Sequence, residues 1–252
     1  MVIYHTNDMH GRGAALRWLE EHALEQSERL LLDSGDAISG SNTVFRRYED
    51  NLAAMSRLGY TAMAMGNREF NYLRSVQRMR ERQRNFPCLC ANLEDLASPI
   101  HYFAPYYEME VPVAAGPALR LGLTGATPVQ YPISSPWEAL FRFRFLDPLG
   151  VVPALAQALA ARCDLVIVLS HLGLEVDRLL APSLPAGTLI LGGHTHTRLD
   201  EPLDCGRGRF IFQTGAFARS VGRLQLDLER ATSSWQVRLH NFALFDTGGA
   251  NR

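Results

Sequence analysis

The sequence predicts an α/β protein in which short strands are joined through helices. Its 252 residues, 47% of them hydrophobic, suffice for one large domain with a substantial core. In the first half, short apolar runs alternate with stretches of helical periodicity, the pattern of strands connected by helical crossovers. Polar residues follow the ends of several predicted strands, where open α/β sheets build their ligand sites.

The first half of the chain contains three predicted strands, each followed by a predicted helix. We expect the strands at residues 2–5, 29–32 and 62–65, and the helices at 14–25, 44–58 and 73–84. The last of these helices carries a run of arginines: Arg74, Arg78, Arg80, Arg82 and Arg84. We interpret this run as a solvated helix face, with a funnel for anionic substrates as the alternative.

In the second half, strand patterns predominate. Residues 102–123 look strand-like but are interrupted by three prolines, and the proline-rich stretch 127–136 is expected to be a loop. A helix is expected at 154–162, followed by buried strands at 165–169 and 189–191. The last apolar segments, at 210–213, 221–228 and 235–245, predict an antiparallel meander. Without an internal repeat or a convincing linker, residues 1–252 are expected to form a single domain.

Composition excludes several classes of protein. The net charge of -1 gives no reason to expect nucleic acid or a membrane surface as a partner. All 25 basic residues are arginine, which excludes a Walker-type phosphate loop, a lysine Schiff base and Ser/Lys acyl transfer. The four cysteines are too few for a disulfide scaffold and lack CxxC spacing. No apolar leader precedes Val2 and no run is long enough to span a membrane, so we expect a cytoplasmic protein.

Metal-competent side chains recur at five predicted strand ends. The segments are Asn7-Asp8-Met9-His10-Gly11, Asp33-Ser34-Gly35-Asp36, Gly66-Asn67-Arg68-Glu69, Ser170-His171 and Gly192-Gly193-His194-Thr195-His196. In the first and last segments two candidate ligands are two residues apart, Asp8 with His10 and His194 with His196. In an extended chain this spacing places both side chains on one face. Taken alone, an aspartate after a strand is more often a helix cap, and a single histidine more often a core residue. Five such segments in order favour a metal centre.

The ligand types indicate which ions the centre would take. Mixed Asp, Asn and His donors suit a divalent ion such as Mn, Fe, Zn or Co, and do not suit calcium. Seven candidates are too many for one tetrahedral ion and fit two ions that share a carboxylate. The candidates are Asp8, His10, Asp36, Asn67, His171, His194 and His196.

With these motifs, the sequence resembles the calcineurin-like metallophosphoesterases, and most closely the catalytic domain of the 5'-nucleotidase group. The similarity continues through residues 213–217 to Val221-Gly222-Arg223. The resemblance implies a four-layer fold in which a two-sheet β-sandwich is flanked by helices, with two metals at one rim. One metal would take Asp8, His10, Asp36 and His196, and the other Asp36, Asn67, His171 and His194. Asp36 would therefore be the bridging ligand.

The sequence departs from this family at a position expected to be catalytic. The family motif reads Gly-Asn-His-Glu, with an Asp three residues after the His, whereas this chain has Arg68 and Asn71. A guanidinium cannot donate a proton at working pH, although it can neutralise phosphate charge. Losing a general acid typically costs about 10²–10⁴ in rate, unless the leaving group needs no proton. Arg68 therefore favours a phosphoanhydride or another good leaving group. We also expect the protein to lack the C-terminal domain and the secretion signal that are usual in the 5'-nucleotidase group.

The predicted function is hydrolysis of phosphoesters or phosphoanhydrides, with nucleotide-like compounds as small phosphorylated substrates. In this hypothesis a hydroxide shared by two divalent ions, with Mn, Fe or Zn as candidates, attacks phosphorus in line. Asp36 and Arg68 are the expected catalytic residues. Asn7, Asp33 and Asn92 are expected to lie next to the metal ligands and to hold them in position. The alternatives are a non-catalytic phosphate-binding module and a subunit that needs a partner chain.

Overall fold

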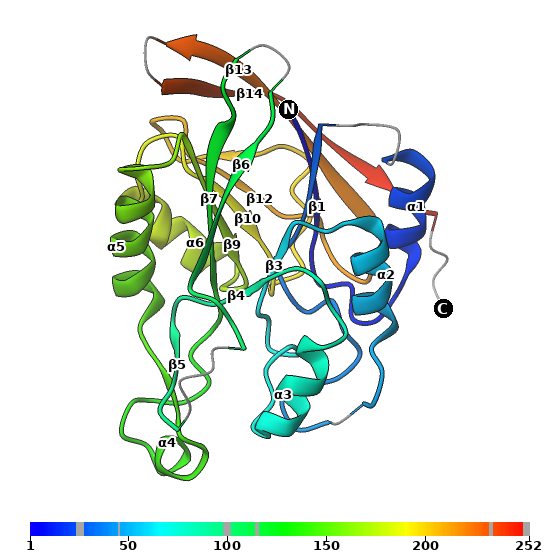
Figure 1. The fold of residues 1–252 in the computed structure, drawn as a ribbon, viewed down its shortest axis with the longest axis vertical. Helices are drawn as coiled ribbons and strands as arrows, with labels where there is room; N and C mark the ends of the chain where they lie inside the picture. Colours follow the sequence, from blue (N-terminus) through cyan, green and yellow to red (C-terminus); the bar gives the residue numbers. More distant parts are fainter. Residues whose placement is uncertain (24–27, 45, 98–101, 114–115, 232–233, 249–252) are drawn as a thin grey trace.

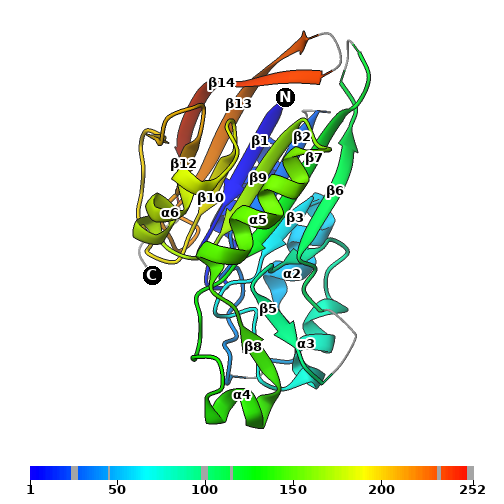
Figure 2. The same ribbon diagram turned by 90° about the vertical axis from the view of Figure 1, so that its left-hand side faces the viewer.

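A computed structural model describes the chain except residues 24–27, 45, 98–101, 114–115, 232–233 and 249–252 (Figure 1). Two six-stranded sheets lie face to face, and helices cover their outer faces (Figures 1 and 2). This arrangement confirms the predicted four-layer α/β fold. Within the described residues, no helix is both long and apolar enough to cross a membrane.

The first sheet is built around the amino-terminal strands. Its strand order is β14-β13-β1-β2-β3-β4, in which β1 to β4 are parallel, β13 pairs antiparallel with β1, and β14 pairs antiparallel with β13. The strands are β1 Val2–Thr6, β2 Arg29–Asp33, β3 Ala62–Ala64, β4 Cys88–Leu89, β13 Ser220–Ala231 and β14 Ser234–Asp246.

The second sheet has a parallel centre and antiparallel edges. Its strand order is β11-β12-β10-β9-β7-β6, and β12, β10, β9 and β7 run parallel. The strands are β6 Tyr106–Val111, β7 Leu119–Ala126, β9 Leu165–Ser170, β10 Leu189–Gly192, β11 Leu203–Asp204 and β12 Phe210–Phe212. Strand β9 is buried along its whole length, as its continuous apolar sequence requires.

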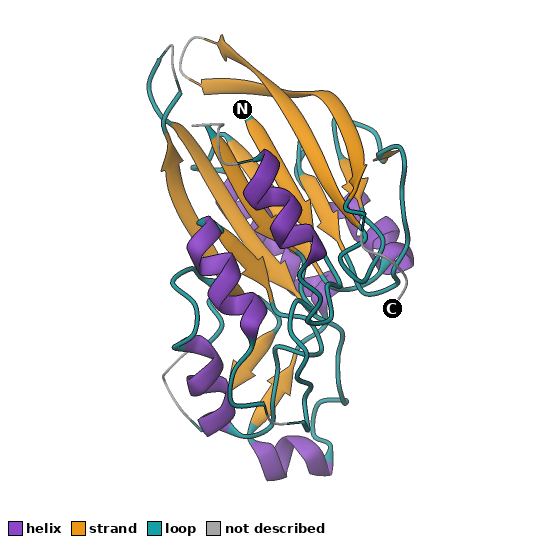
Figure 3. Cartoon of the chain, turned by 90° about the vertical axis from the view of Figure 1, so that its right-hand side faces the viewer, coloured by secondary structure: helices purple, strands orange, loops and turns teal. Residues whose placement is uncertain are grey.

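Three apolar clusters separate the four layers. Side chains that alternate along a strand point to opposite faces, so Ile3 packs between the sheets while Tyr4 packs outward. The outer face of the first sheet is covered by α1 (Ala14–His22) and α2 (Asp50–Leu58), which lie at the front of Figure 3. The outer face of the second is covered by α5 (Pro148–Ala160), α6 (Leu174–Leu180) and the short 3₁₀ helix η1 (Ala181–Ser183), and Figure 2 shows α5 and α6 in front of this sheet.

A smaller group of elements lies beyond the ends of the strands, at the lower end of Figures 1 and 2. It comprises α3 (Arg74–Glu81), α4 (Pro136–Phe141) and a two-stranded sheet of β5 (Leu93–Asp95) and β8 (Phe143–Phe145). Its buried aromatic residues stack edge to face, with Phe70 against Phe143 and Phe145.

Several predicted boundaries differ from the structure. The helix expected at 44–58 begins only at Asp50. Ahead of it, the Val44 N–H donates to the Ser41 hydroxyl and closes a turn, and residue 45 lies outside the described part. The helix expected at 154–162 begins earlier, where Asp147 caps it ahead of Pro148. The helix expected at 14–25 ends at His22 as α1, and residues 24 and 25 lie outside the described part. Helix α6 was not predicted.

The prediction of a C-terminal meander was wrong for its first strand. β12 pairs in parallel with β10 in the second sheet, whereas β13 and β14 form a hairpin in the first. Residues 213–219 therefore cross from one sheet to the other. A strand's apolar pattern predicts that it is buried but not which sheet it joins, so the sequence did not reveal this crossing.

Candidate metal centre

The predicted ligands come together where the two sheets end. Strands β1, β2 and β3 of the first sheet lead into the segments at Asp8, Asp36 and Asn67, and β9 and β10 of the second lead into those at His171 and His194. In Figure 1, β1 begins beside the N-terminal label, so the carboxyl ends lie at the lower rim of the sheets. Parallel strands thus deliver their following loops to one rim.

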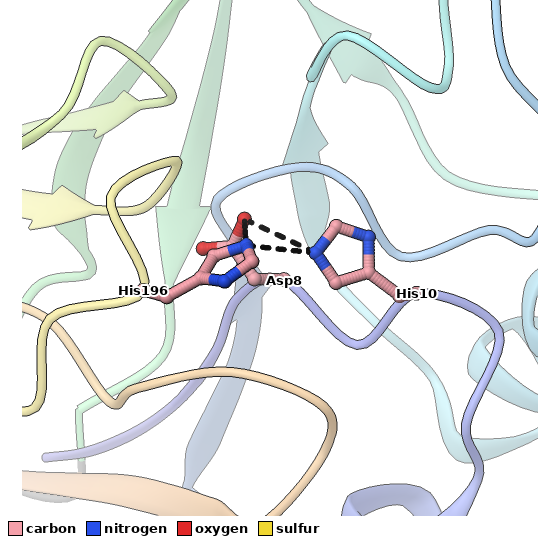
Figure 4. Close-up of side chains that lie close together, drawn as sticks. All are labelled: Asp8, His10 and His196. Carbon is pink, nitrogen blue, oxygen red and sulfur yellow. Dashed lines mark hydrogen bonds and ion pairs between the residues drawn. The ribbon is translucent and has the colours of Figure 1, made fainter.

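One compact group contains Asp8, His10 and His196, whose ligand atoms lie within 4.8 Å of one another. The two imidazoles face each other, with 2.9 Å between their Nε2 atoms. The Oδ1 atom of Asp8 lies 3.5 Å from Nε2 of His196 and 3.8 Å from Nε2 of His10 (Figure 4). Three donors that converge on one point are the arrangement that a bound cation requires.

A second compact group contains Asp8, Asp36 and His171, all buried. Nε2 of His171 lies 3.4 Å from Oδ1 of Asp36 and 4.0 Å from Oδ1 of Asp8. The other oxygen of Asp36 lies 3.8 Å from Nδ1 of His10. Asp8 therefore belongs to both groups. Asp36 faces His171 of the second group and His10 of the first. The role of Asp36 as the bridging ligand stays a prediction.

Asn67 and His194, the other two predicted ligands, lie beside these groups. The His194 ring centre is 5.1 Å from that of His171, and its backbone N–H donates to Oδ2 of Asp8 at 2.9 Å. The side-chain oxygen of Asn67 is buried and has no hydrogen-bond partner among the described residues. Six of the seven predicted ligands thus lie close together, and Asn67 directly precedes Arg68, whose backbone N–H donates to Oδ1 of Asp36 at 2.8 Å.

The unpartnered polar atoms of the centre fit a bound cation. Buried polar atoms are normally hydrogen-bonded, so each exception needs a cause. Among the described residues, the buried side-chain atoms without a hydrogen-bond partner include Oδ1 of Asp8, Nδ1 of His10, Oδ1 of Asn67 and Nε2 of His171. Mixed oxygen and imidazole donors suit borderline divalent ions.

The neighbours of His171 determine which of its nitrogens can bind a metal. Nδ1 lies 2.7 Å from the carbonyl oxygen of Ser34, and a carbonyl can only accept, so Nδ1 carries the proton and Nε2 faces the carboxylates. Burial alone would lower the pKa of His171, but Asp36 and Asp8 outweigh it and raise the pKa to about 9. Burial would likewise raise the pKa of Asp36, but its contact with His171 lowers it to about 2.

The pKa values of His10 and His194 are lowered, whereas that of His171 is raised. Burial lowers the pKa of His10 to about 4, and it also lowers the pKa of His194. Both imidazoles are therefore neutral near pH 7, which is the form that binds a metal.

The backbone around the ligands is strained. Of the ten non-glycine residues with positive φ in the described part, five are predicted ligands: Asp8, His10, Asp36, His194 and His196. Left-handed backbone at such residues is unfavourable and concentrates at functional sites. The motifs gave no sign of this strain.

The expected supporting residues differ in what they contact. Asn7 donates to Oδ2 of Asp8 at 2.7 Å and also bonds to the 214–215 segment, so it connects a ligand to the crossing between the sheets. Asp33 accepts from Thr6 and from the backbone of Gly35, which shapes the turn before Asp36.

The hydrogen bonds of Asn92 go to the loops at Thr127 and Leu146. Its amide donates to the carbonyls of Thr127 and Leu146, and its oxygen accepts from the Thr127 N–H. Within the described chain these bonds connect two loops and do not reach a predicted ligand. A role for Asn92 at the centre stays a prediction.

Glu69 has a supporting role that the sequence analysis missed. Its buried carboxylate accepts from the backbone N–H groups of Asp36 at 2.8 Å, Gly66 at 2.9 Å and Ala37 at 3.0 Å. It therefore fixes the Asp36 turn against the loop that carries Asn67. The only signal in the sequence was its place at the end of the Gly-Asn-Arg-Glu segment.

Arg68 and Asn71 both contact the loop at residues 39–41 rather than each other. The Arg68 guanidinium donates to the carbonyls of Ser39 and Gly40 at 3.4 and 3.3 Å, and its Nε lies 3.8 Å from Asp36. The Asn71 amide donates to the carbonyl of Ser41 at 3.0 Å. Arg68, whose side chain is 36% exposed, is thus held beside the second group and still reaches solvent.

The family follows from a match that covers this whole arrangement. The model of the calcineurin-like phosphoesterases matches residues 1–198, a stretch that includes all seven predicted ligands. The chain belongs to the calcineurin-like phosphoesterase family. The resemblance inferred from the motifs is therefore confirmed.

Relatives place the chain near the 5'-nucleotidases within this family. It is 31% identical to a 5'-nucleotidase of Diplobatis ommata over 79% of this chain and 38% of the relative, and 31% identical to one of Vibrio cholerae over 77% and 40%. The chain thus corresponds to about two fifths of the length of these relatives.

Solved structures agree with the fold. A calcineurin-like phosphoesterase of Bacillus subtilis matches with a TM-score of 0.77 at 18% identity, over 99% of this chain and 91% of that one. A 5'-nucleotidase precursor of Thermus thermophilus matches with a TM-score of 0.69 at 24% identity, over 95% and 54%.

Proposed function

We propose that the chain is a metal-dependent phosphohydrolase that favours phosphoanhydrides and other substrates with good leaving groups. The observation that most strongly supports this proposal is the presence of two compact ligand groups that share Asp8. Membership of the calcineurin-like phosphoesterases and similarity to 5'-nucleotidases support the same reaction class. Nucleotides are the proposed substrate class, and residues 1–252 are proposed to form one catalytic domain.

Two divalent ions would be held by the seven predicted ligands, and when bound they would act as Lewis acids toward water and the phosphoryl oxygens. The chain's own residues keep these ligands in place. Glu69 and Asn7 fix the loops of Asp36 and Asp8, and Ser34 fixes the tautomer of His171. Mn, Fe and Zn are the proposed ions, because the donors are imidazole, carboxylate and amide groups.

Arg68 determines the preference for the leaving group. Its guanidinium lies next to Asp36, where it adds positive charge beside the phosphate that is attacked. It cannot supply the proton that an alkoxide leaving group needs. A phosphate leaving group needs none near neutral pH, because its second pKa is about 6. Cleavage of an anhydride is therefore compatible with Arg68, whereas hydrolysis of a nucleoside monophosphate is disfavoured.

The test compares substrates that differ in their leaving group. The purified chain is stripped of metal, reloaded with Mn and assayed on ADP, a UDP-sugar, bis(p-nitrophenyl) phosphate and AMP, in parallel with the Arg68→His variant. We expect the wild type to cleave the anhydrides and to turn AMP over poorly. Arg68→His should gain AMP hydrolysis by at least about 10-fold, since a general acid contributes about 10²–10⁴.

Two outcomes would contradict this proposal. AMP hydrolysis that equals ADP hydrolysis in the wild type would remove the argument from the leaving group. Full metal loading without turnover of any substrate would favour the second candidate, a phosphate-binding module. The phosphate-binding module is favoured by one observation: Arg68 and Asn71 occupy the positions of the His and Asp in the family motif.

A further inference from the structure

A fully buried histidine that is not a predicted ligand lies one hydrogen bond away from the ligand loops. Alternation along β1 points the side chain of His5 to the same side as that of Ile3, into the apolar layer between the sheets. Its Nε2 lies 2.9 Å from the hydroxyl oxygen of Ser34. Its Nδ1 is buried without a hydrogen-bond partner among the described residues. A polar ring in an apolar layer is costly, so its single bond needs a cause.

The bonds of Ser34 determine which atom donates to which. The Ser34 hydroxyl lies 2.6 Å from the carbonyl oxygen of Leu191, and a carbonyl can only accept, so the one hydroxyl proton is used there. The bond between His5 and Ser34 must then be donated by Nε2–H of the ring. Burial lowers the pKa of His5 to about 3, so the ring is neutral near pH 7 and has only this one N–H. His5 therefore fixes the orientation of the Ser34 hydroxyl.

Ser34 in turn connects the two sheets at the rim that carries the ligands. It follows β2 of the first sheet, and its hydroxyl donates to Leu191 in β10 of the second. Its carbonyl accepts from Nδ1 of His171, which follows β9 of the second sheet, at 2.7 Å. Strands β9 and β10 are neighbours in that sheet. One residue of the first sheet thus bonds to the ends of two adjacent strands of the second.

The contact between Ser34 and His171 is closely surrounded by backbone. A Cβ atom on Gly193 would lie 3.0 Å from the Ser34 carbonyl oxygen and 3.1 Å from Nδ1 of His171. A Cβ atom on Gly35 would lie 2.9 Å from the same nitrogen. The ring is therefore confined between two glycine segments, and its Nε2 lies 3.4 Å from Oδ1 of Asp36. A shift of the Ser34 peptide would move Nε2 relative to this carboxylate.

We propose that His5 is a positioning residue of the metal centre, which acts through the Ser34 hydroxyl to hold His171 against Asp8 and Asp36. A residue that orients a metal ligand through a hydrogen bond typically changes metal affinity by about 10–100-fold. Among the described residues, His10 and His196 of the first group bond to neither His5 nor Ser34. The effect should therefore fall on the ion that His171 binds. The inference rests on the proposed function, because it requires the two ions of that proposal.

The test measures the affinity of each ion rather than turnover. Metal-free chain is titrated calorimetrically with Mn, and the two binding steps are assigned with His171→Asn and His196→Ala, each of which should lose one of them. Ser34→Ala removes only the hydroxyl. His5→Leu removes the ring N–H, whereas His5→Gln can still donate a hydrogen bond from about the position of Nε2.

The control is a buried hydroxyl far from the ligands in sequence. Thr124, which is fully buried in β7, donates from its hydroxyl to the carbonyl of Pro105 at 2.8 Å. Thr124→Val removes this donor with little change of shape, as Ser34→Ala removes the donor to Leu191. Thermal unfolding is followed for every variant, so that a loss of stability is measured separately from a loss of metal affinity.

We expect Ser34→Ala and His5→Leu to bind the His171 ion at least about 10-fold more weakly and the other ion within about 3-fold of wild type. His5→Gln and Thr124→Val should bind both ions within about 3-fold of wild type, although Thr124→Val is less stable because a carbonyl loses its donor. A general structural role would instead weaken both ions in proportion to the loss of stability, and glutamine would not restore the affinity.

Unchanged affinities in Ser34→Ala and His5→Leu, or equal weakening of both ions, would overturn the inference. A His5→Gln variant that binds as weakly as His5→Leu would also overturn it. If Ser34→Ala does not fold, the comparison of the two His5 variants decides in the same way. If the His171 ion is weakened as expected but the wild type hydrolyses no phosphate substrate, the positioning role stands and the proposed hydrolysis fails. If the wild type hydrolyses ADP and all variants bind both ions normally, the reverse holds.

Discussion

His171 is prepared for a metal by groups on both sides of its ring. The Ser34 carbonyl holds the proton on Nδ1, and Asp36 and Asp8 face Nε2 at 3.4 and 4.0 Å. The same carboxylates raise the pKa of His171 to about 9, so the metal-free chain holds a second proton on this ring at neutral pH. A metal must displace that proton, because only the neutral imidazole binds.

We therefore predict that metal uptake at pH 7.5 releases about one proton from His171 and that affinity rises with pH up to about 9. His10, whose pKa is lowered to about 4, releases none. In the metal-free chain, this proton stabilises the fold below pH 6.5, and the contribution disappears as pH rises through 9. Calorimetric titration with Mn in two buffers of different ionisation heat measures the release. A release that is unchanged in His171→Asn would contradict this assignment.

At the level of elements, helix α3 shows what the sequence could and could not predict. Its position follows from helical periodicity, but the interpretation of its arginines as a solvated face was wrong for Arg80. Arg80 as a whole is 4% exposed, and its guanidinium lies within hydrogen-bonding distance of five backbone carbonyls: those of Arg68, Glu69, Phe70, Ser41 and Val44. The carbonyls belong to loops distant in sequence, so no local pattern could reveal them.

Arg80 accordingly holds the Arg68 loop against the 39–44 loop. We predict that Arg80→Met lowers the free energy of unfolding by about 3 kcal/mol, because it leaves buried carbonyls unpaired. Arg78→Met, an exposed change on the same helix, should alter it by less than about 0.5 kcal/mol. Urea denaturation of both variants provides the comparison. Similar losses in the two would show that Arg80 has no such role.

At the level of the whole molecule, the site was more predictable than the topology that forms it. The ligands are local features, since each motif follows its own strand, and parallel strands bring these ends to one rim. The crossing at 213–219 was not predictable, because the assignment of β12 and β13 to different sheets depends on long-range pairing. The contact of Phe217, in this crossing, with His10 and His196 could therefore not be expected; the ring centres are 5.2 and 5.1 Å apart.

The central claim is that one shared centre binds two metal ions and supports phosphoryl hydrolysis. The most direct measurement is the number of Mn ions per chain, determined by mass spectrometry after stripping and reloading, with ADP hydrolysis followed on the same samples. We predict two ions in the wild type, one in His196→Ala and almost none in Asp8→Asn, which removes the carboxylate common to both groups. Hydrolysis that survives complete metal removal, or two ions retained in Asp8→Asn, would contradict the account.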